Sequence, residues 1–169
     1  CALGFLVESF WDRGVDAHGI DISQYAISNV RRDMQAYCSV ASLTAPIQGS
    51  YDLVTCIEVL EHMPEDEARQ AISRMTGATD SILFSSTPDD FTEPTHVNVH
   101  SIIYWLRLFA EFQFYPDLVF DASFIAPHAF LVRRSQASVP QDVLRLFSET
   151  LRNRIYRAAV LSRHNRIEH

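Results

Sequence analysis

The chain has 169 residues, of which 47% are hydrophobic and 21% charged, a balance typical of a single globular domain. Its formal net charge of −7 argues against broad binding to a nucleic-acid backbone, which needs a basic surface. No apolar run approaches the roughly 20 residues of a membrane span, and the sequence has no secretory signal. The three cysteines are odd in number and lack metal-binding spacing, so we expect reduced thiols in a cytoplasmic protein.

Predicted strands and helices alternate through the first half of the chain. Gly14 and Gly77 are typical helix stops, and Ser23 is a good helix N-cap. Strands that alternate with helices predict an α/β fold, with a mainly parallel sheet covered on both faces as a three-layer sandwich. The elements predicted in this half are helix 2–13, strand 15–21, helix 23–34, strand 36–40, strand 51–57, helix 64–77 and strand 81–86.

The second half of the chain is predicted to end the sheet differently. We expect a helix over 100–112 and then two strands, 118–124 and 128–133, joined by only a few residues. Such a short link cannot make a parallel crossover, so these strands should form an antiparallel hairpin. We therefore divide the chain into a domain, residues 1–135, and a C-terminal amphipathic helical extension, residues 136–169. The apolar seam of this extension would pack on the domain, pair two copies into a homodimer, or lie on an anionic surface.

Three segments resemble, in order, the class I S-adenosylmethionine-dependent methyltransferases. Residues 1–5 resemble the end of that family's Asp-x-Gly-x-Gly-x-Gly loop, with Gly4 as the last glycine and Ala2 in the place of the middle one. Residues 19–23 resemble the end of its second strand, and residues 51–62 resemble its fourth strand and the loop that follows. The resemblance implies a Rossmann-like domain whose first strand is missing from this sequence, so we expect the chain to be truncated at its N-terminus.

The resemblance also implies S-adenosylmethionine as the cofactor and suggests which residues bind it. In such folds ligands lie at the carboxyl ends of the strands, where a glycine-rich turn lets the backbone come close. Asp21 is placed to accept hydrogen bonds from both ribose hydroxyls, although a surface acid or a helix N-cap would fit the same pattern. Many relatives bind the adenine amino group with an acid, for which this chain offers only Ser42. The expected cofactor-binding residues are Gly4, Asp21, Ile22, Ser42, Cys56, Ile57 and Glu58.

Glu58, Glu61 and His62 are spaced i, i+3 and i+4, so in a helical turn they would share one face. Two carboxylates and an imidazole can ligate a divalent cation, and His100, with His96 as the alternate, could complete the set from a later loop. The segment resembles the Glu-x-x-Glu-His loop of small-RNA 3′-terminal 2′-O-methyltransferases and of ubiquinone-pathway O-methyltransferases. The resemblance implies Mg²⁺ or Mn²⁺ at this set, where it would lower the pKa of an acceptor hydroxyl. Two alternatives stay open: a metal-free site with His96 or His100 as the catalytic base, and histidines with a purely structural role.

These features predict an O-methyltransferase. Residues 85–91 and 95–100 resemble loops of bacterial methyltransferases found beside glycosyltransferases, which suggests a hydroxyl of a sugar, a glycan or another small molecule as the acceptor. The ribose 2′-hydroxyl of an RNA end is the second candidate, and the acidic charge of the chain argues against it. A catalytically inactive Rossmann-like binding module is the third, because the first glycines of the loop are missing from this sequence.

Overall fold

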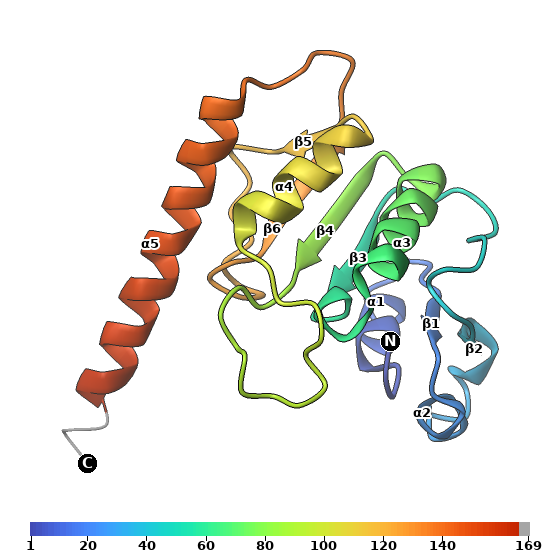
Figure 1. Cartoon of the computed structure of the whole chain (residues 1–169). Coiled ribbons are helices and arrows are strands. Elements are labelled where there is room, and N and C mark those ends of the chain that lie inside the picture. Colours follow the sequence, from blue (N-terminus) through green and yellow to red (C-terminus); the bar gives the residue numbers. More distant parts are fainter. Residues whose placement is uncertain (166–169) are drawn as a thin grey trace. The chain divides into compact units, whose positions relative to one another are not determined.

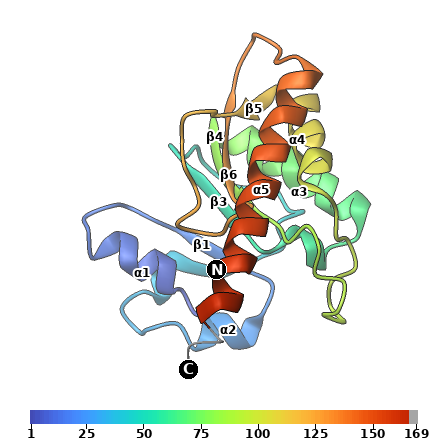
Figure 2. The same ribbon diagram turned by 90° about the vertical axis from the view of Figure 1, so that its left-hand side faces the viewer.

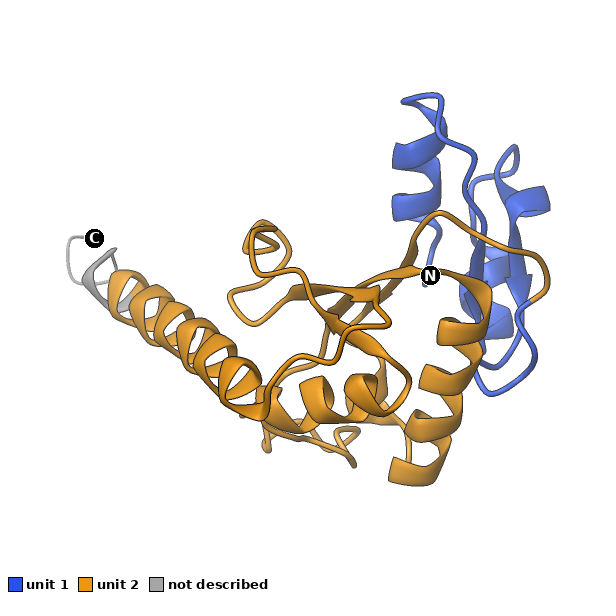
Figure 3. Ribbon diagram, turned by 90° about the horizontal axis from the view of Figure 1, so that it is seen from above, with its two compact units in different colours: residues 1–47 blue, residues 48–169 orange. Residues whose placement is uncertain are grey.

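The computed structural model describes residues 1–165, and the chain forms two compact units (Figures 1 and 3). The first unit covers residues 1–47, and the second begins at Gln48. Both combine helices with parallel strands, which confirms the predicted α/β class. Residues 166–169, the end of the predicted C-terminal extension, lie outside the described part of the chain.

The first unit is built around two short parallel strands. β1 (Gly19–Asp21) pairs with β2 (Cys38–Val40). Two helices, α1 (Phe5–Trp11) and α2 (Gln24–Ser28), accompany these strands, and a 3-10 turn (Gln35–Tyr37) leads into β2. The buried residues of the apolar core are Val7, Ile27, Val30, Met34 and Cys38.

The first helix stops near Gly14, as predicted, but it spans Phe5–Trp11 and so begins three residues later than expected. Gly14 has a left-handed backbone, with φ of 74°, and its N–H donates to the Trp11 carbonyl oxygen at 2.9 Å. The next N–H, of Val15, donates to the Phe10 carbonyl oxygen at 3.0 Å. These two bonds form a Schellman motif, which satisfies carbonyls that the helix end would otherwise leave free.

The second helix begins as predicted but ends early. The Ser23 hydroxyl accepts a hydrogen bond from the Ala26 N–H at 3.1 Å, so the predicted N-cap is confirmed. The prediction that this helix continues to Met34 is wrong, because it ends at Ser28. The side-chain amide of Asn29 donates to a carbonyl oxygen of the last turn at 2.8 Å, and such local bonds compete with helix continuation.

The second unit contains a four-stranded sheet with helices beside it. Its elements are β3 (Val54–Ile57), a 3-10 turn (Leu60–His62), α3 (Glu65–Ala78), β4 (Ser81–Ser85), α4 (Ile102–Glu111), β5 (Phe114–Pro116), β6 (Phe130–Arg134) and α5 (Gln141–Asn165). The strand order is β3-β4-β6-β5, with β3 and β4 parallel and β6 antiparallel to both of its neighbours. The carboxyl ends of β3 and β4 and the amino end of β6 therefore meet at one edge of the sheet (Figure 1).

The predicted antiparallel pair is present, but one of its strands is misplaced. β5 occupies residues 114–116 rather than 118–124, and residues 117–129 connect it to β6. The Asp117 carboxylate accepts hydrogen bonds from the N–H groups of Val119 and Phe120, both at 3.1 Å. An aspartate that bonds the backbone in this way forms a turn, which explains why no strand starts at residue 118.

Phe84 lies at the centre of the core on one face of this sheet. Its ring centroid lies 5.5 Å from that of Trp105 and 5.1 Å from that of Phe109, both in α4. Because successive strand residues point to opposite faces, the neighbouring Leu83 belongs to the other face. A smaller cluster covers that face: Leu83, Ala122, Ala129 and Leu131.

α5 packs along α4 (Figure 2). Leu144 and Leu151 are fully buried, whereas Tyr156 and Leu161 further along the helix are exposed. Among the helices that the structure describes, none has both the length and the apolar character needed to cross a membrane.

Candidate active site

Polar side chains of the second unit gather where β3 and β4 end and β6 begins. Glu58 and Glu61 follow β3, Ser86 follows β4, and His128 precedes β6. In sheets of this kind, ligands bind outside the carboxyl ends of the strands. This edge is therefore the candidate active site within the second unit.

Glu58 is held in a strained conformation at this edge. Its φ of 51° is left-handed, which a non-glycine residue rarely adopts, and its N–H donates to the Ser85 carbonyl oxygen at 3.0 Å. Its Oε1 lies 2.9 Å from Nε2 of His128. Burial alone would raise the pKa of Glu58, but the hydrogen bond from His128 helps to hold the pKa below its ordinary range. The carboxylate is therefore ionised and bound to an imidazole.

Glu61 is fully buried, and neither of its carboxylate oxygens has a partner in good hydrogen-bond geometry among the described residues, although Glu58 and Ser86 lie close enough to act on its pKa. The buried hydroxyls of Ser85 and Ser86 also lack partners in good geometry within the same part of the chain, but Ser85 is near enough to lower the pKa of Glu58, and Ser86 to act in the same direction on Glu61. Burial raises the pKa of Glu61, and the neighbouring carboxylate of Glu58 raises it further. Buried polar groups are normally satisfied, so this cluster marks a place where a ligand, an ion or water belongs.

The structure brings Glu61, His62 and His96 together. One possible ligand atom of each lies within 4.8 Å of the other two, and the two imidazole ring centroids are 4.7 Å apart. The N–H groups of Val97 and Asn98 donate to the Glu61 carbonyl oxygen at 2.9 and 3.0 Å, which fixes the later loop against the earlier one. One carboxylate and two imidazoles form a donor set that suits a divalent cation.

Two residues of the predicted metal set are not part of this group. Glu58 does not share a helical face with Glu61 and His62, because its left-handed φ precedes the only helical turn here, Leu60–His62. Its carboxylate is bonded to His128 instead. His96 takes the position in the group that was expected for His100.

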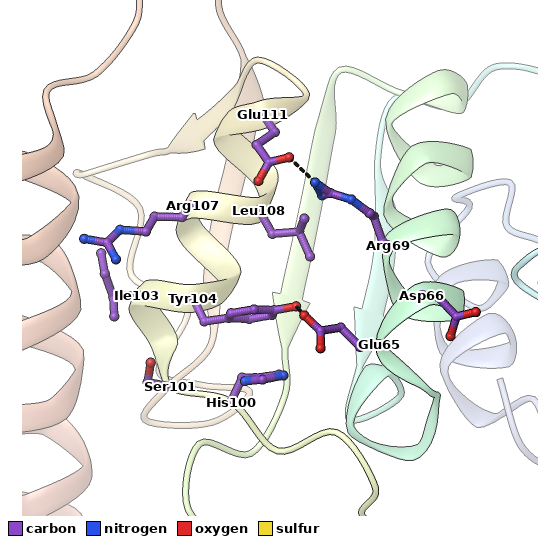
Figure 4. Close-up of a pocket in the computed structure, with 10 residues that line it drawn as sticks. All are labelled: Glu65, Asp66, Arg69, His100, Ser101, Ile103, Tyr104, Arg107, Leu108 and Glu111. Atoms are coloured by element: carbon purple, nitrogen blue, oxygen red, sulfur yellow. Dashed lines mark hydrogen bonds and ion pairs between the residues drawn. The ribbon is translucent and has the colours of Figure 1, made fainter.

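His100 lines a groove between α3 and α4 (Figure 4). Its ring stacks on that of Tyr104 with centroids 3.7 Å apart, and the Tyr104 hydroxyl donates to Oε1 of Glu65 at 2.8 Å. The groove measures about 880 Å³ and is crossed by an ion pair between Arg69 and Glu111. His100 therefore packs against an aromatic ring in the groove between α3 and α4.

Asp21 stands at the carboxyl end of β1 in the first unit and is held by backbone N–H groups. Its Oδ2 accepts from the Ala2 N–H at 2.8 Å, and its Oδ1 accepts from the Ser23 N–H at 2.9 Å. Its Oδ2 also accepts a hydrogen bond from the amino group of Cys1 at 3.0 Å. Burial alone would raise the pKa of Asp21, but the two backbone bonds, together with the Cys1 amino group, outweigh it and lower the pKa. Asp21 is thus an ionised acid tied to the turn that contains Gly4.

The conformation of this turn explains why residue 4 is a glycine. Gly4 has φ of 77°, and a Cβ at this position would lie 3.1 Å from a methyl carbon of Val30 and 3.3 Å from the sulfur of Cys38. Both the conformation and the close packing therefore require glycine. Ala2 also has a positive φ, of 47°, which glycine would adopt without strain.

The remaining predicted cofactor-binding residues differ in how exposed they are and in whether their polar groups are already engaged. Ile22 is 76% exposed, whereas the Ser42 hydroxyl is 2.7 Å from that of Thr44. Cys56 is buried, and burial raises the pKa of its thiol to about 12, so its sulfur is inert. Ile57 is partly buried at the end of β3.

A family model described as "Methyltransferase domain" matches residues 1–80 of this chain. The ubiquinone biosynthesis O-methyltransferase of Azoarcus sp. (strain BH72) is 32% identical over 102 residues, which cover 54% of this chain and 43% of that protein. The match therefore extends over less than half the length of this curated relative.

Two solved structures share the fold. The magnesium protoporphyrin IX methyltransferase of Synechocystis PCC 6803 with bound SAH has a TM-score of 0.66 at 19% identity, over 80% of this chain and 71% of that one. The O-methyltransferase of a trans-AT polyketide synthase multienzyme of Brevibacillus brevis, in complex with S-adenosyl-L-homocysteine, has a TM-score of 0.65 at 12% identity, over 94% and 75%. At these identities the likeness shows the fold alone.

Proposed function

The chain belongs to the class I S-adenosylmethionine-dependent methyltransferases, and from this premise we propose that it methylates a hydroxyl group of a small molecule. The observation that carries the proposal is the hydrogen bond between Asp21 and the Ala2 N–H, which joins the acid at the end of β1 to the turn of Gly4. A glycine turn next to a strand-end acid suits a nucleoside cofactor, because the turn admits the ligand and the acid accepts its ribose hydroxyls.

We assign the cofactor's ribose to Asp21, whose carboxylate has acceptor capacity beyond its two backbone bonds and its bond from the Cys1 amino group. Gly4 provides close backbone approach, and Ile22 and Ser42 provide packing or polar contact near the adenine.

The proposed reaction is an in-line attack of the acceptor oxygen on the sulfonium methyl group. The protein then has two tasks, to position the reactants and to take up the hydroxyl proton. The names of the Azoarcus relative and of the Brevibacillus structure support oxygen as the nucleophile. The net charge of −7 favours a sugar or another small molecule over the ribose of an RNA end.

A divalent cation fits the second unit. Glu61, His62 and His96 would hold it, and the buried, unpartnered carboxylate of Glu61 supports a positive group at this place within the described chain. Mg²⁺ or Mn²⁺ would lower the pKa of an acceptor hydroxyl. The chain itself contributes the hydrogen bonds from Val97 and Asn98 that keep the His96 loop against Glu61.

Calorimetric titration with S-adenosylhomocysteine tests the cofactor assignment. Asp21→Ala should weaken binding by roughly 1.5–3 kcal/mol, because it removes a charge-assisted acceptor from the ribose hydroxyls. Asp16→Ala is the matched control, since Asp16 is an exposed acid of the same unit that pairs with His18. Equal affinity of wild type and Asp21→Ala would contradict the assignment.

Transfer of a tritiated methyl group tests the reaction. The acceptors are 3,4-dihydroxybenzoate, methyl α-mannoside and a short RNA duplex, each with Mn²⁺ and with EDTA. Methylation of either small molecule supports the proposal, and methylation of the RNA alone replaces it. A protein that neither binds the cofactor product nor methylates any acceptor is the inactive module. Full turnover in EDTA would exclude the cation.

A further inference from the structure

His128 is an imidazole that no motif of the sequence predicts. It lies in the connection between β5 and β6, and its side chain is 14% exposed. Its Nε2 lies 2.9 Å from Oε1 of Glu58, which stands 70 positions earlier in the chain. His128 therefore belongs to the sheet edge at which Glu58 and Glu61 gather, and it is still within reach of a ligand.

The bond to Glu58 fixes the state of the ring. An ionised carboxylate is only an acceptor, so Nε2 of His128 must carry the hydrogen that the bond contains. In the neutral imidazole the other nitrogen, Nδ1, then keeps its lone pair. A carboxylate that orients an imidazole in this way leaves the opposite nitrogen ready to accept a proton.

The other imidazoles at this edge are engaged differently. Nδ1 of His62 lies 3.1 Å from the Thr95 hydroxyl, and Nδ1 of His96 lies 2.8 Å from the Asp90 carbonyl oxygen. Both rings belong to the group that we assign to a cation, and a nitrogen that binds a metal cannot act as a base. Nδ1 of His96 also lies 3.7 Å from the carboxylate of Asp90, which is beyond hydrogen-bond distance. Of the histidines described at this edge, His128 is therefore the one whose ring is hydrogen-bonded to a carboxylate.

Glu58 is well placed to orient the ring because its own position is fixed. Its backbone is left-handed, and its N–H is bonded to the Ser85 carbonyl oxygen at 3.0 Å. A strained residue persists only where its surroundings determine it fully, and such residues are concentrated at functional sites. The strain at Glu58 thus places a carboxylate where His128 needs one.

We propose that His128 is the base that accepts the proton of the acceptor hydroxyl, with Glu58 as the residue that positions its ring. The proposal rests on the proposed methyl transfer. The acceptor oxygen forms a bond to the methyl carbon while the carbon–sulfur bond breaks, and that electron pair remains on sulfur. The hydroxyl proton passes to Nδ1 of His128, and the Glu58 carboxylate stabilises the resulting imidazolium.

Methyl transfer by His128→Gln is the first test, with whichever of 3,4-dihydroxybenzoate and methyl α-mannoside the wild type methylates. Loss of the base should lower kcat by about 100-fold or more, while the affinity for S-adenosylhomocysteine stays at the wild-type value. Glu58→Gln keeps an acceptor but removes its charge, so it should lower kcat by about 10-fold. His18→Gln, which changes an exposed histidine of the first unit, is the control and should keep the wild-type rate.

Nitrogen NMR of protein with ¹⁵N-labelled histidine is the second test and needs no acceptor. At a pH at which the imidazole is neutral, His128 should show a proton on Nε2 and a bare Nδ1, with the signal assigned by its loss in His128→Gln. The opposite tautomer overturns the proposal, and so does a wild-type kcat or a lost S-adenosylhomocysteine affinity in His128→Gln. A wild type that methylates neither acceptor and does not bind S-adenosylhomocysteine overturns the proposed function itself, and the role of His128 with it.

Discussion

Replacement of Gly4 by alanine should destabilise the protein by about 2 kcal/mol. The left-handed φ of 77° costs an alanine roughly 1–2 kcal/mol. The added Cβ would lie 3.1 Å from Val30 and 3.3 Å from Cys38, both buried, and moving them costs roughly 1–2 kcal/mol more. The smaller freedom of the unfolded alanine chain offsets about 0.4–1 kcal/mol of this cost.

Two other glycines of the chain separate these contributions. Gly14 has a similar φ of 74°, but a Cβ there would meet nothing within 4 Å, so Gly14→Ala should cost only about 0.5–1 kcal/mol. Gly77 is helical, within α3, and also has open space around it. Gly77→Ala should therefore stabilise the protein by about 0.5–1 kcal/mol.

Urea titrations measure the free energy of unfolding of all four proteins, with the slope m compared to ensure that the unfolding transition is unchanged. The expected order of stability is Gly77→Ala, wild type, Gly14→Ala and Gly4→Ala. Equal losses in Gly14→Ala and Gly4→Ala would refute the crowding argument. A Gly14→Ala protein as stable as wild type would refute the argument from φ.

Three further predictions concern the second unit. Asp117 has a lowered pKa because the Arg133 guanidinium donates to it, so its stabilisation is present above the ordinary aspartate pKa and is lost as the pH falls through the folded value. Asp117→Asn should therefore cost about 0.5–1 kcal/mol at neutral pH and less in acid, and a difference that does not change with pH would contradict the ion pair. Gln113 follows α4 and has a left-handed φ of 62°, so Gln113→Gly should raise the free energy of unfolding by about 0.5–1 kcal/mol. An unchanged melting temperature in this variant would show that Gln113 is unstrained. Glu61→Gln should abolish calorimetric binding of Mn²⁺ while Glu67→Gln, an exposed acid of α3, keeps it; retained binding in Glu61→Gln would remove Glu61 from the cation site.

The sequence predicts the positions of β3 and β4 closely, because each strand is a short apolar run and its apolar composition alone is enough to indicate a buried strand. Strands expected over 51–57 and 81–86 occur as Val54–Ile57 and Ser81–Ser85. The same reasoning fails at 118–124, which is equally rich in apolar residues. There the Asp117 carboxylate bonds two successive backbone N–H groups and turns the chain, so a single side chain outweighs the β propensity of the segment.

The sequence indicates which acidic residues and histidines belong to the candidate site, but it does not indicate which of them contact one another. The i, i+3, i+4 spacing of Glu58, Glu61 and His62 predicts one helical face, and the left-handed φ of Glu58 removes it. The choice between His96 and His100 depends on where the later loop is anchored. That anchor is a pair of backbone bonds to the Glu61 carbonyl oxygen, and backbone bonds of this kind leave no pattern in the side chains.

The pair of His128 and Glu58 lies beyond sequence pattern for a different reason. The two residues stand 70 positions apart, and β6 brings them together because it runs antiparallel to β4 and begins where β4 ends. A prediction of this contact needs the strand order first. The predicted strand 118–124 occupies residues that in fact belong to the connection before β6, so the sequence alone does not indicate that His128 lies near Glu58.

Strain distinguishes the residues that serve the site from those that serve the fold. In the described chain the non-glycine residues with positive φ are Ala2, Glu58 and Gln113, and each costs roughly 1–2 kcal/mol. At Gln113 the conformation only closes α4, so glycine would supply it at no loss. At Ala2 the strained backbone points an N–H at Asp21, and at Glu58 it points a carboxylate at His128. Glycine at Glu58 would relieve the strain but remove the carboxylate, so the protein keeps the less stable residue where the proposed chemistry requires its side chain.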